Sequence, residues 1–148
     1  MRRFLAVTLA WILLTAAVIS SVHAELISKT YLFKKGVTLE MGADVGEGLR
    51  LDSIRFYDPA SFGSRLMRPG GGVKAEVQLS NSGGQSRRFG IAIALFDDQD
   101  RLLGVASGGS KFLSLKPERQ STYTLVFSDV KAEASEATRF KISVEPRF

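Results

Sequence analysis

The sequence predicts an all-β fold, an antiparallel β-sandwich of seven to eight strands that follows an N-terminal signal peptide. Three observations support this prediction. Apolar and polar residues alternate with a period of two along much of the chain after residue 24. Turn-forming clusters separate the alternating stretches at spacings of about ten residues, as in sandwiches. Along the same part of the chain, no stretch shows the sustained i, i+3, i+4, i+7 apolar pattern of an amphipathic helix.

The first 24 residues have the three-part layout of a secretory signal peptide. Arg2 and Arg3 give a positive start, an apolar stretch runs over residues 4–19, and Val22-His23-Ala24 forms a small-residue cleavage pattern. We expect cleavage after Ala24 and a periplasmic or secreted protein. The alternative is an uncleaved membrane anchor, because about 18 apolar residues can just span a bilayer. The chain has no Cys, so we expect no lipid anchor.

Composition after cleavage narrows the chemistry. The mature chain would have 124 residues (148 less 24) and a net charge of +3 (+5 less two arginines). Cleavage removes His23 and Trp11, the only His and the only Trp. A chain without Cys or His lacks the usual zinc and copper ligands, the Ser-His-Asp triad and the Cys nucleophile. We therefore expect no catalysis, no metal and no cofactor. An enzyme using a carboxylate pair, such as a glycosidase, is the disfavoured rival.

The N-terminal half contributes strands and one long loop to a single predicted domain over residues 25–148. Strands are expected over 25–33, 37–41 and 49–56, and Gly42, Gly46 and Gly48 mark the turns between the last two. A Pro/Gly-rich loop follows over residues 58–72. The domain thus divides into N-terminal strands (25–57), this loop, and a C-terminal sandwich core (73–148).

The C-terminal core supplies the clearest strands. A half-exposed strand covers 73–79, a turn covers 81–86, and residues 88–106 form a β-hairpin around the polar turn Asp97–Asp100. A short strand is expected over 111–115, strong strands over 122–127 and 139–145, and at most one helical turn between them. The residues expected in the core are Ile93, Leu95, Leu125, Phe127, Phe140 and Ile142.

The strand near residues 88–96 has no polar face. Ile91, Ile93 and Leu95 share one side, while Gly90, Ala92 and Ala94 share the other. Small side chains on a strand face let another backbone approach closely. We therefore expect this strand to be central and covered on both sides. The expected cover for the small-residue side is the segment 49–56, in preference to a second copy or a partner.

The run from Val73 to Val130 resembles bacterial immunoglobulin-like domains of the FxLYD type. It reads VKAEVQLSNSGGQSRRFGIAIALFDDQDRLLGVAS and continues with LKPERQSTYTLVF. Leu95 and Asp97 match the FxLYD pattern, whereas Ile93 stands in place of its Phe and Phe96 in place of its Tyr. The resemblance implies an immunoglobulin-like sandwich in an extracytoplasmic setting, and it carries no catalytic residues.

Two acidic or glycine-rich turns could be ligand sites. Asp97, Asp98 and Asp100 could bind Ca²⁺ through carboxylate oxygens, but Asp is also common in turns, where it caps backbone N–H groups. The spacing lacks the glycine and distal Glu of an EF-hand, so we favour a turn. The stretch 42–48 contains Gly, Asp and Glu, but no GK[ST] follows it, so we expect a hairpin turn and not a phosphate loop.

Basic pairs and a loop remain as interaction sites. Lys34-Lys35 and Arg87-Arg88, with Arg65 and Arg68, could attract polyanions, although solvated charges at strand ends are the favoured interpretation. A second set is Tyr57, Phe62 and Met67, which lie around or within the Pro/Gly-rich loop. These three either anchor a partner or fold back to plug one end of the sandwich.

Taken as a sequence, the chain predicts an exported, non-catalytic β-sandwich module that binds another cell-envelope protein. The alternative is a weak binder of anionic polysaccharide or of a lipid surface. Aromatic residues do not interleave with the basic pairs, so nucleic acid is not an expected partner. After cleavage of the signal peptide we expect no stable insertion into a membrane.

Overall fold

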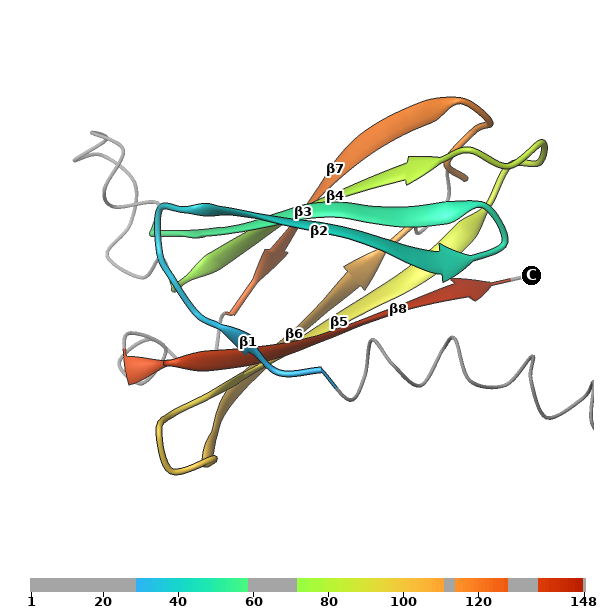
Figure 1. Ribbon diagram of the computed structural model, residues 1–148. Helices are drawn as coiled ribbons and strands as arrows, with labels where there is room; N and C mark the ends of the chain where they lie inside the picture. The colour runs from blue at the N-terminus through green and yellow to red at the C-terminus, as the bar shows by residue number, and fades with distance from the viewer. Residues whose placement is uncertain (1–28, 59–71, 111–113, 128–135, 148) are drawn as a thin grey trace, which may run out of the picture.

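A computed structural model describes residues 29–58, 72–110, 114–127 and 136–147, and these residues contain eight β-strands (Figure 1). The strands are β1 (Tyr31–Leu32), β2 (Thr38–Gly46), β3 (Leu49–Tyr57), β4 (Lys74–Asn81), β5 (Arg88–Phe96), β6 (Leu102–Gly109), β7 (Arg119–Val126) and β8 (Arg139–Arg147). Among the described residues, no helix is long and apolar enough to cross a membrane.

The strands form two four-stranded sheets that face each other. Sheet A has the order β1-β8-β5-β6, and sheet B has the order β2-β3-β4-β7. Every pair of neighbouring strands is antiparallel. The prediction of an all-β antiparallel sandwich with seven to eight strands is therefore confirmed (Figure 1).

The core lies between the two sheets. Alternate residues of the central strands point inward, so the burial pattern of β4 and of β8 follows the period of two that the sequence shows. All six residues predicted for the core are buried, and Phe127 has no exposed surface. Phe127 lies just beyond β7, where its N–H donates to the carbonyl of Val73 at 3.1 Å. Phe56 and Phe140 pack edge to face across the two sheets, with ring centroids 4.8 Å apart.

The N-terminal strands are part of both sheets. β3 lies between β2 and β4 in sheet B, whereas β1 pairs with β8 in sheet A, so the chain crosses from one sheet to the other after Leu32. The strand expected over 25–33 is shorter in the described part of the chain, where only Tyr31 and Leu32 pair. The short strand expected over 111–115 appears as one bridge between Leu115 and Arg87, and residues 111–113 lie outside the described residues.

The hairpin between β2 and β3 is tighter than the sequence predicts. Gly42 lies inside β2, at a register shift between Glu40 and Ala43, and is therefore not part of the turn. The turn consists of Glu47 and Gly48 alone, with φ of 56° and 80°. Positive φ at both central residues is the signature of a type I′ hairpin turn. A Cβ on Gly48 would lie 2.5 Å from the Cα of Gly83, so this position has no room for a side chain.

Asn81 at the end of β4 forms side-chain hydrogen bonds to two later segments, the turn at Gly83–Gln85 and Leu115. Its side chain is buried, and its Nδ2 donates to the carbonyls of Gln85 at 2.8 Å and Leu115 at 2.9 Å. Its Oδ1 accepts a hydrogen bond from the N–H of Gly83 at 2.9 Å. Both amide donors and the acceptor are therefore used, as a buried amide requires.

The expected cover for the small-residue face of β5 is wrong. β5 is central, between β8 and β6, as predicted. However, β3 belongs to the opposite sheet, and its buried residues face the side of β5 that carries Ile91, Ile93 and Leu95. Ala92 on the other side is exposed. Sheet A therefore has an outer face that segment 49–56 does not cover, because a sandwich buries only the inner face of each sheet.

Candidate functional site

The outer face of sheet A carries a row of side chains that crosses all four strands. The register places Leu32 of β1 beside Arg139 of β8, Arg139 beside Phe96 of β5, and Phe96 beside Leu102 of β6. Leu32 is 67% exposed and Leu102 is 58% exposed. We call these four residues the outer row. Three of its four members are apolar, and two of these, Phe96 and Leu102, are direct neighbours.

The next row along the same face continues this character. It consists of Lys141, Ala94 and Val105, on β8, β5 and β6. Val105 is 56% exposed. Leu32, Leu102 and Val105 are three of the five large hydrophobic side chains that the described residues expose, so these side chains gather on one face.

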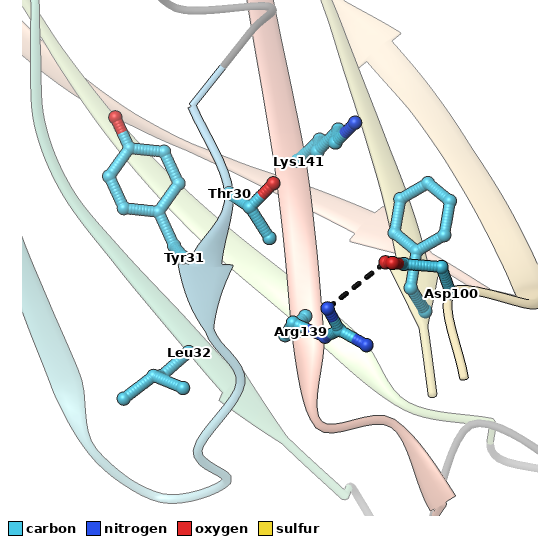
Figure 2. A pocket seen from close by; sticks show the side chains of 7 residues that line it. Thr30, Tyr31, Leu32, Asp100, Arg139 and Lys141 are labelled. Atoms are coloured by element: carbon cyan, nitrogen blue, oxygen red, sulfur yellow. Dashed lines mark ion pairs between the residues drawn. The ribbon is translucent and has the colours of Figure 1, made fainter. Parts of the chain in front are cut away.

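A pocket of about 490 Å³ opens at the β1 side of this face (Figure 2). Its lining comprises Thr30, Tyr31, Leu32, Phe96, Asp100, Arg139 and Lys141. We call it the β1–β8 pocket. The ring of Tyr31 stacks on Phe140 of the core, with the ring centroids 5.3 Å apart, and this contact fixes its position.

The β1–β8 pocket contains two positively charged side chains. Arg139 is paired with a carboxylate, and Lys141 is exposed. The guanidinium of Arg139 lies 3.1 Å from the carboxylate of Asp100 and also donates to the carbonyl of Asp97 at 2.8 Å (Figure 2). The ammonium of Lys141 lies 5.5 Å from the ring centroid of Phe96. This is within cation–π range. The lining therefore combines two positive charges, one negative charge and exposed apolar surface.

Asp97 is held inside the β5–β6 turn. Its carboxylate accepts from the N–H groups of Gln99 and Arg101, each at 2.9 Å, and from the Arg101 guanidinium at 2.6 Å. Burial alone would raise the pKa of Asp97, but these hydrogen bonds and the charge of Arg101 outweigh it and lower the pKa. The same bond to Asp97 raises the pKa of Arg101. Asp97 therefore caps its turn, as the favoured interpretation of the acidic cluster predicts.

The three acidic residues of this turn do not converge. Asp97 points into the turn, while Asp100 pairs with Arg139 of β8. Within the residues that the structure describes, no group of three acidic or histidine side chains could hold a metal ion.

A second depression lies at the other end of the same face, with a volume of about 490 Å³. Its lining includes the small residues Gly90, Ala92, Ser107, Gly108, Gly109, Ser110 and Ser143. The Arg147 guanidinium lies over Gly90, since a Cβ there would be 2.9 Å from Nη2. The small residues of β5 thus leave space that a long side chain of β8 partly fills.

Of the residues predicted as an interaction loop, the structure describes only Tyr57. It is the last residue of β3 and is half-buried, and burial, followed by the charge of Glu76, raises its pKa. Phe62 and Met67 lie outside the described residues, as do Arg65, Arg68 and the predicted signal peptide.

The two described basic pairs do not form one patch. Lys35 bridges to Phe56 near one end of β3. Arg87 contacts Glu47, beside the other end of β3, through an ion pair of 2.7 Å. The polyanion-binding surface considered from the sequence is therefore not assembled from these pairs.

Sequence reasoning missed the β1–β8 pocket. Arg139 and Lys141 read as the exposed side of the last strand, and Leu32 as part of a longer strand. What unites them is the pairing of β1 with β8, which are more than a hundred residues apart in the chain. The only local signal was that Phe96 interrupts the run of small residues on its face.

The fold and the site together define a two-sheet β-sandwich with a partly apolar, partly cationic outer face. No protein-family model and no curated protein matches the chain. Two solved structures resemble it, each at 14% sequence identity. The trimeric lipoprotein SadB of Salmonella enterica has a TM-score of 0.46, with 97% of this chain and 77% of that chain covered. A DUF1425 family member from Shewanella sp. pv-4 has a TM-score of 0.37, with 82% and 98% covered.

Proposed function

We propose that the protein is an exported, non-catalytic module that binds another cell-envelope protein through the β1–β8 pocket. One observation carries this proposal, the outer row, in which Leu32 and Phe96 flank Arg139 and Leu102 lies beside Phe96 on the outer face of sheet A. Exposed apolar groups with an adjacent cation are typical of protein-binding surfaces, where aromatic and Arg side chains supply much of the affinity.

The side chains of the pocket indicate which chemical groups a partner should present. Leu32 is exposed apolar surface, Tyr31 is fixed against the core, and Lys141 is an exposed cation beside Phe96. A complementary segment would present an apolar side chain to Leu32 and Phe96 and a carboxylate to Lys141. Arg139 is less suited to bind that carboxylate because Asp100 already pairs with it.

Export and the immunoglobulin-like type belong to the same proposal. Arg2, Arg3, the apolar stretch and the Val22-His23-Ala24 pattern support export. The strand that ends in Asn81, followed by the hairpin of β5 and β6, supports a sandwich of the FxLYD type. The intact mass of the protein recovered from outside the cytoplasm should correspond to a chain beginning at Glu25. Full-length chain in the membrane fraction would instead support an uncleaved anchor.

The test is a pull-down from envelope extract with immobilised protein. The Leu32→Asp and Lys141→Glu variants should each reduce recovery of a specific protein at least tenfold. Val37→Asp is the matched control, because Val37 is 46% exposed and lies outside the pocket. Equal recovery by all four proteins would remove the pocket from the function.

The alternative function is weak binding to anionic polysaccharide or lipid, and the two cations of the pocket favour it. Sedimentation with anionic vesicles or with an anionic polysaccharide measures it directly. Three results together would establish this alternative. Lys141→Glu should abolish the binding, 0.5 M salt should remove it, and the pull-down should capture no protein. The salt dependence follows because the Debye length falls from about 8 Å at 0.15 M to about 3 Å at 1 M, so attraction between exposed charges is largely screened at high salt.

A further inference from the structure

Two arginines stand side by side at the second depression on the outer face of sheet A. Arg147 of β8 lines the depression, and the register places Arg88 of β5 directly opposite Arg147. Both side chains are exposed, and neither forms an ion pair within the described part of the chain. Like charges directly opposite each other destabilise paired strands. An anion bound between the two arginines would therefore stabilise this end of the sheet.

Gly90 determines where the guanidinium of Arg147 lies. A Cβ at position 90 would be 2.9 Å from Nη2, 3.2 Å from Nε and 3.3 Å from Cζ of Arg147. The guanidinium therefore lies across β5, in space that any other residue at position 90 would fill. A planar guanidinium matches the two oxygens of a carboxylate or a phosphate, and one that is already positioned loses less entropy when it binds them.

The remainder of the depression offers polar groups that the fold does not use. Ser143 of β8 and Ser107 of β6 lie on either side of Ala92. Neither hydroxyl makes a hydrogen bond within the described residues. Glu145 lies beside Gly90 and supplies one carboxylate. Successive rows on this face are two residues, or about 7 Å, apart, so the guanidinium over Gly90 and the two hydroxyls are within reach of one small molecule.

We propose that this depression is a second binding site, which takes a small polar ligand through a carboxylate or phosphate group. The oxyanion lies between Arg147 and Arg88, and hydroxyl groups of the ligand reach Ser107, Ser143 and Glu145. Charge selects an anionic group, because the two arginines outnumber the single carboxylate. This inference goes beyond the proposed function, because the depression shares no residue with the β1–β8 pocket.

The first test follows the backbone amide signals of the protein, expressed from its full sequence, by NMR spectroscopy at constant ionic strength. The probes are inorganic phosphate and glucuronate, and glucose is the uncharged control. We expect at least one of the two anions to shift the signals of Gly90 and Ala92 to saturation in the millimolar range, because exposed arginines bind anions modestly. The tighter of the two anions identifies the oxyanion that the site prefers. Shifts that do not saturate, or that sodium chloride produces equally, would overturn the proposal.

The second test removes the arginines one at a time. Arg147→Gln and Arg88→Gln should each weaken binding of the anion at least fivefold. Arg119→Gln is the matched control, because it removes the same charge from an exposed position at the start of β7, in the opposite sheet. An equal loss in all three variants would mean a general attraction to a basic protein and would contradict a site. Lys141→Glu should change this binding less than twofold, which separates the outcome from failure of the proposed function.

The third test keeps every charge in place and moves only the guanidinium. Gly90→Ala should weaken binding of the anion at least threefold, because the new Cβ displaces the end of the Arg147 side chain. The nearest atoms all belong to that flexible side chain, so the melting temperature should stay unchanged. Gly84→Ala, where a Cβ meets no atom within 4 Å, is the control. A Gly90→Ala variant that binds the anion as tightly as the wild type would show that the position of Arg147 does not matter, and would overturn the proposal.

Discussion

Asn81 is the residue on which the most local structure depends. Its amide links the end of β4 to the turn at Gly83–Gln85 and to Leu115. A leucine has the same number of side-chain heavy atoms but no polar ones, so it would leave the buried carbonyl of Leu115 and the part-buried carbonyl of Gln85 and N–H of Gly83 without this partner. Each buried group left unpaired costs about 1–3 kcal/mol.

We therefore expect Asn81→Leu to lower the free energy of unfolding by at least about 2 kcal/mol. Urea denaturation followed by fluorescence or circular dichroism measures this change. Gln85→Ala is the control, because Gln85 is exposed and contributes its backbone carbonyl and not its side chain. If Asn81→Leu lowers the free energy of unfolding no more than Gln85→Ala does, the loops do not depend on the Asn81 amide.

Asp97 gives the fold a dependence on pH. Its pKa in the folded protein is below the ordinary value, so folding favours the ionised form. The stability that this adds is fully present above the ordinary pKa of about 4 and is lost as the pH falls through the lower, folded value.

The expected result is a melting temperature that falls as the pH is lowered from 5 to 2, more steeply in the wild type than in Asp97→Asn. The melting temperatures of the wild type and of Asp97→Asn should differ most at neutral pH and should become similar in acid. Asp98→Asn, at an exposed position of the same turn, should follow the wild type. Parallel curves for Asp97→Asn and the wild type would show that this carboxylate does not contribute.

At the scale of the element, alternation predicts which side of a strand is buried. The inward phase of Ile93, Leu125 and Phe140 was readable because a one-residue error would place every large apolar residue of a strand in water. Alternation does not show which segment, if any, packs against the other face of a strand. The small residues Gly90 and Ala92 were therefore assigned a cover that the topology does not provide.

The β2–β3 hairpin depends on Gly48. Its φ of 80° lies in the left-handed region, and Gly83 leaves no room for a Cβ. A residue other than glycine in this region costs about 1–3 kcal/mol. Gly48→Ala should lower the free energy of unfolding by at least that amount, measured by urea denaturation.

Gly84→Ala provides the matched control for this change. Gly84 is in the facing turn, and a Cβ there would meet no atom within 4 Å. Its replacement should change stability by less than about 0.5 kcal/mol, as is usual for surface positions. Similar losses for the two variants would point to a general effect of the turns and not to the geometry of Gly48.

At the scale of the whole molecule, β3 makes the N-terminal strands necessary to the sandwich. It hydrogen-bonds to β2 and β4, and its Leu51, Ile54 and Phe56 are fully buried. A chain that begins at Gly70 would expose the edge of β4 and the core beneath β3.

We expect this shortened chain to be insoluble, or to bind hydrophobic dyes without a cooperative unfolding transition. Thermal melting and dye fluorescence distinguish these outcomes from a native fold. A soluble monomer with a cooperative transition would show that residues 73–148 fold independently, and that the N-terminal strands are an accessory element.

Long-range pairing limits what the sequence reveals about the whole molecule. The hairpin of β5 and β6 is local, and the residues of its turn predict it. The contact of Tyr31 with Phe140 is not local, and a two-residue strand has too few side chains to show alternation. The β1–β8 pocket, which depends on this contact, could not be predicted for the same reason.

The short antiparallel pair of β1 and β8 also determines how the fold responds to mechanical force. Residues before Tyr31 leave β1 in the direction in which β8 continues toward Arg147. Tension applied between these two points would peel β1 away, one residue pair at a time, instead of shearing all the hydrogen bonds together. The first event under force would release Tyr31 and Leu32 and dismantle one wall of the β1–β8 pocket, while β3 stays bonded on both sides.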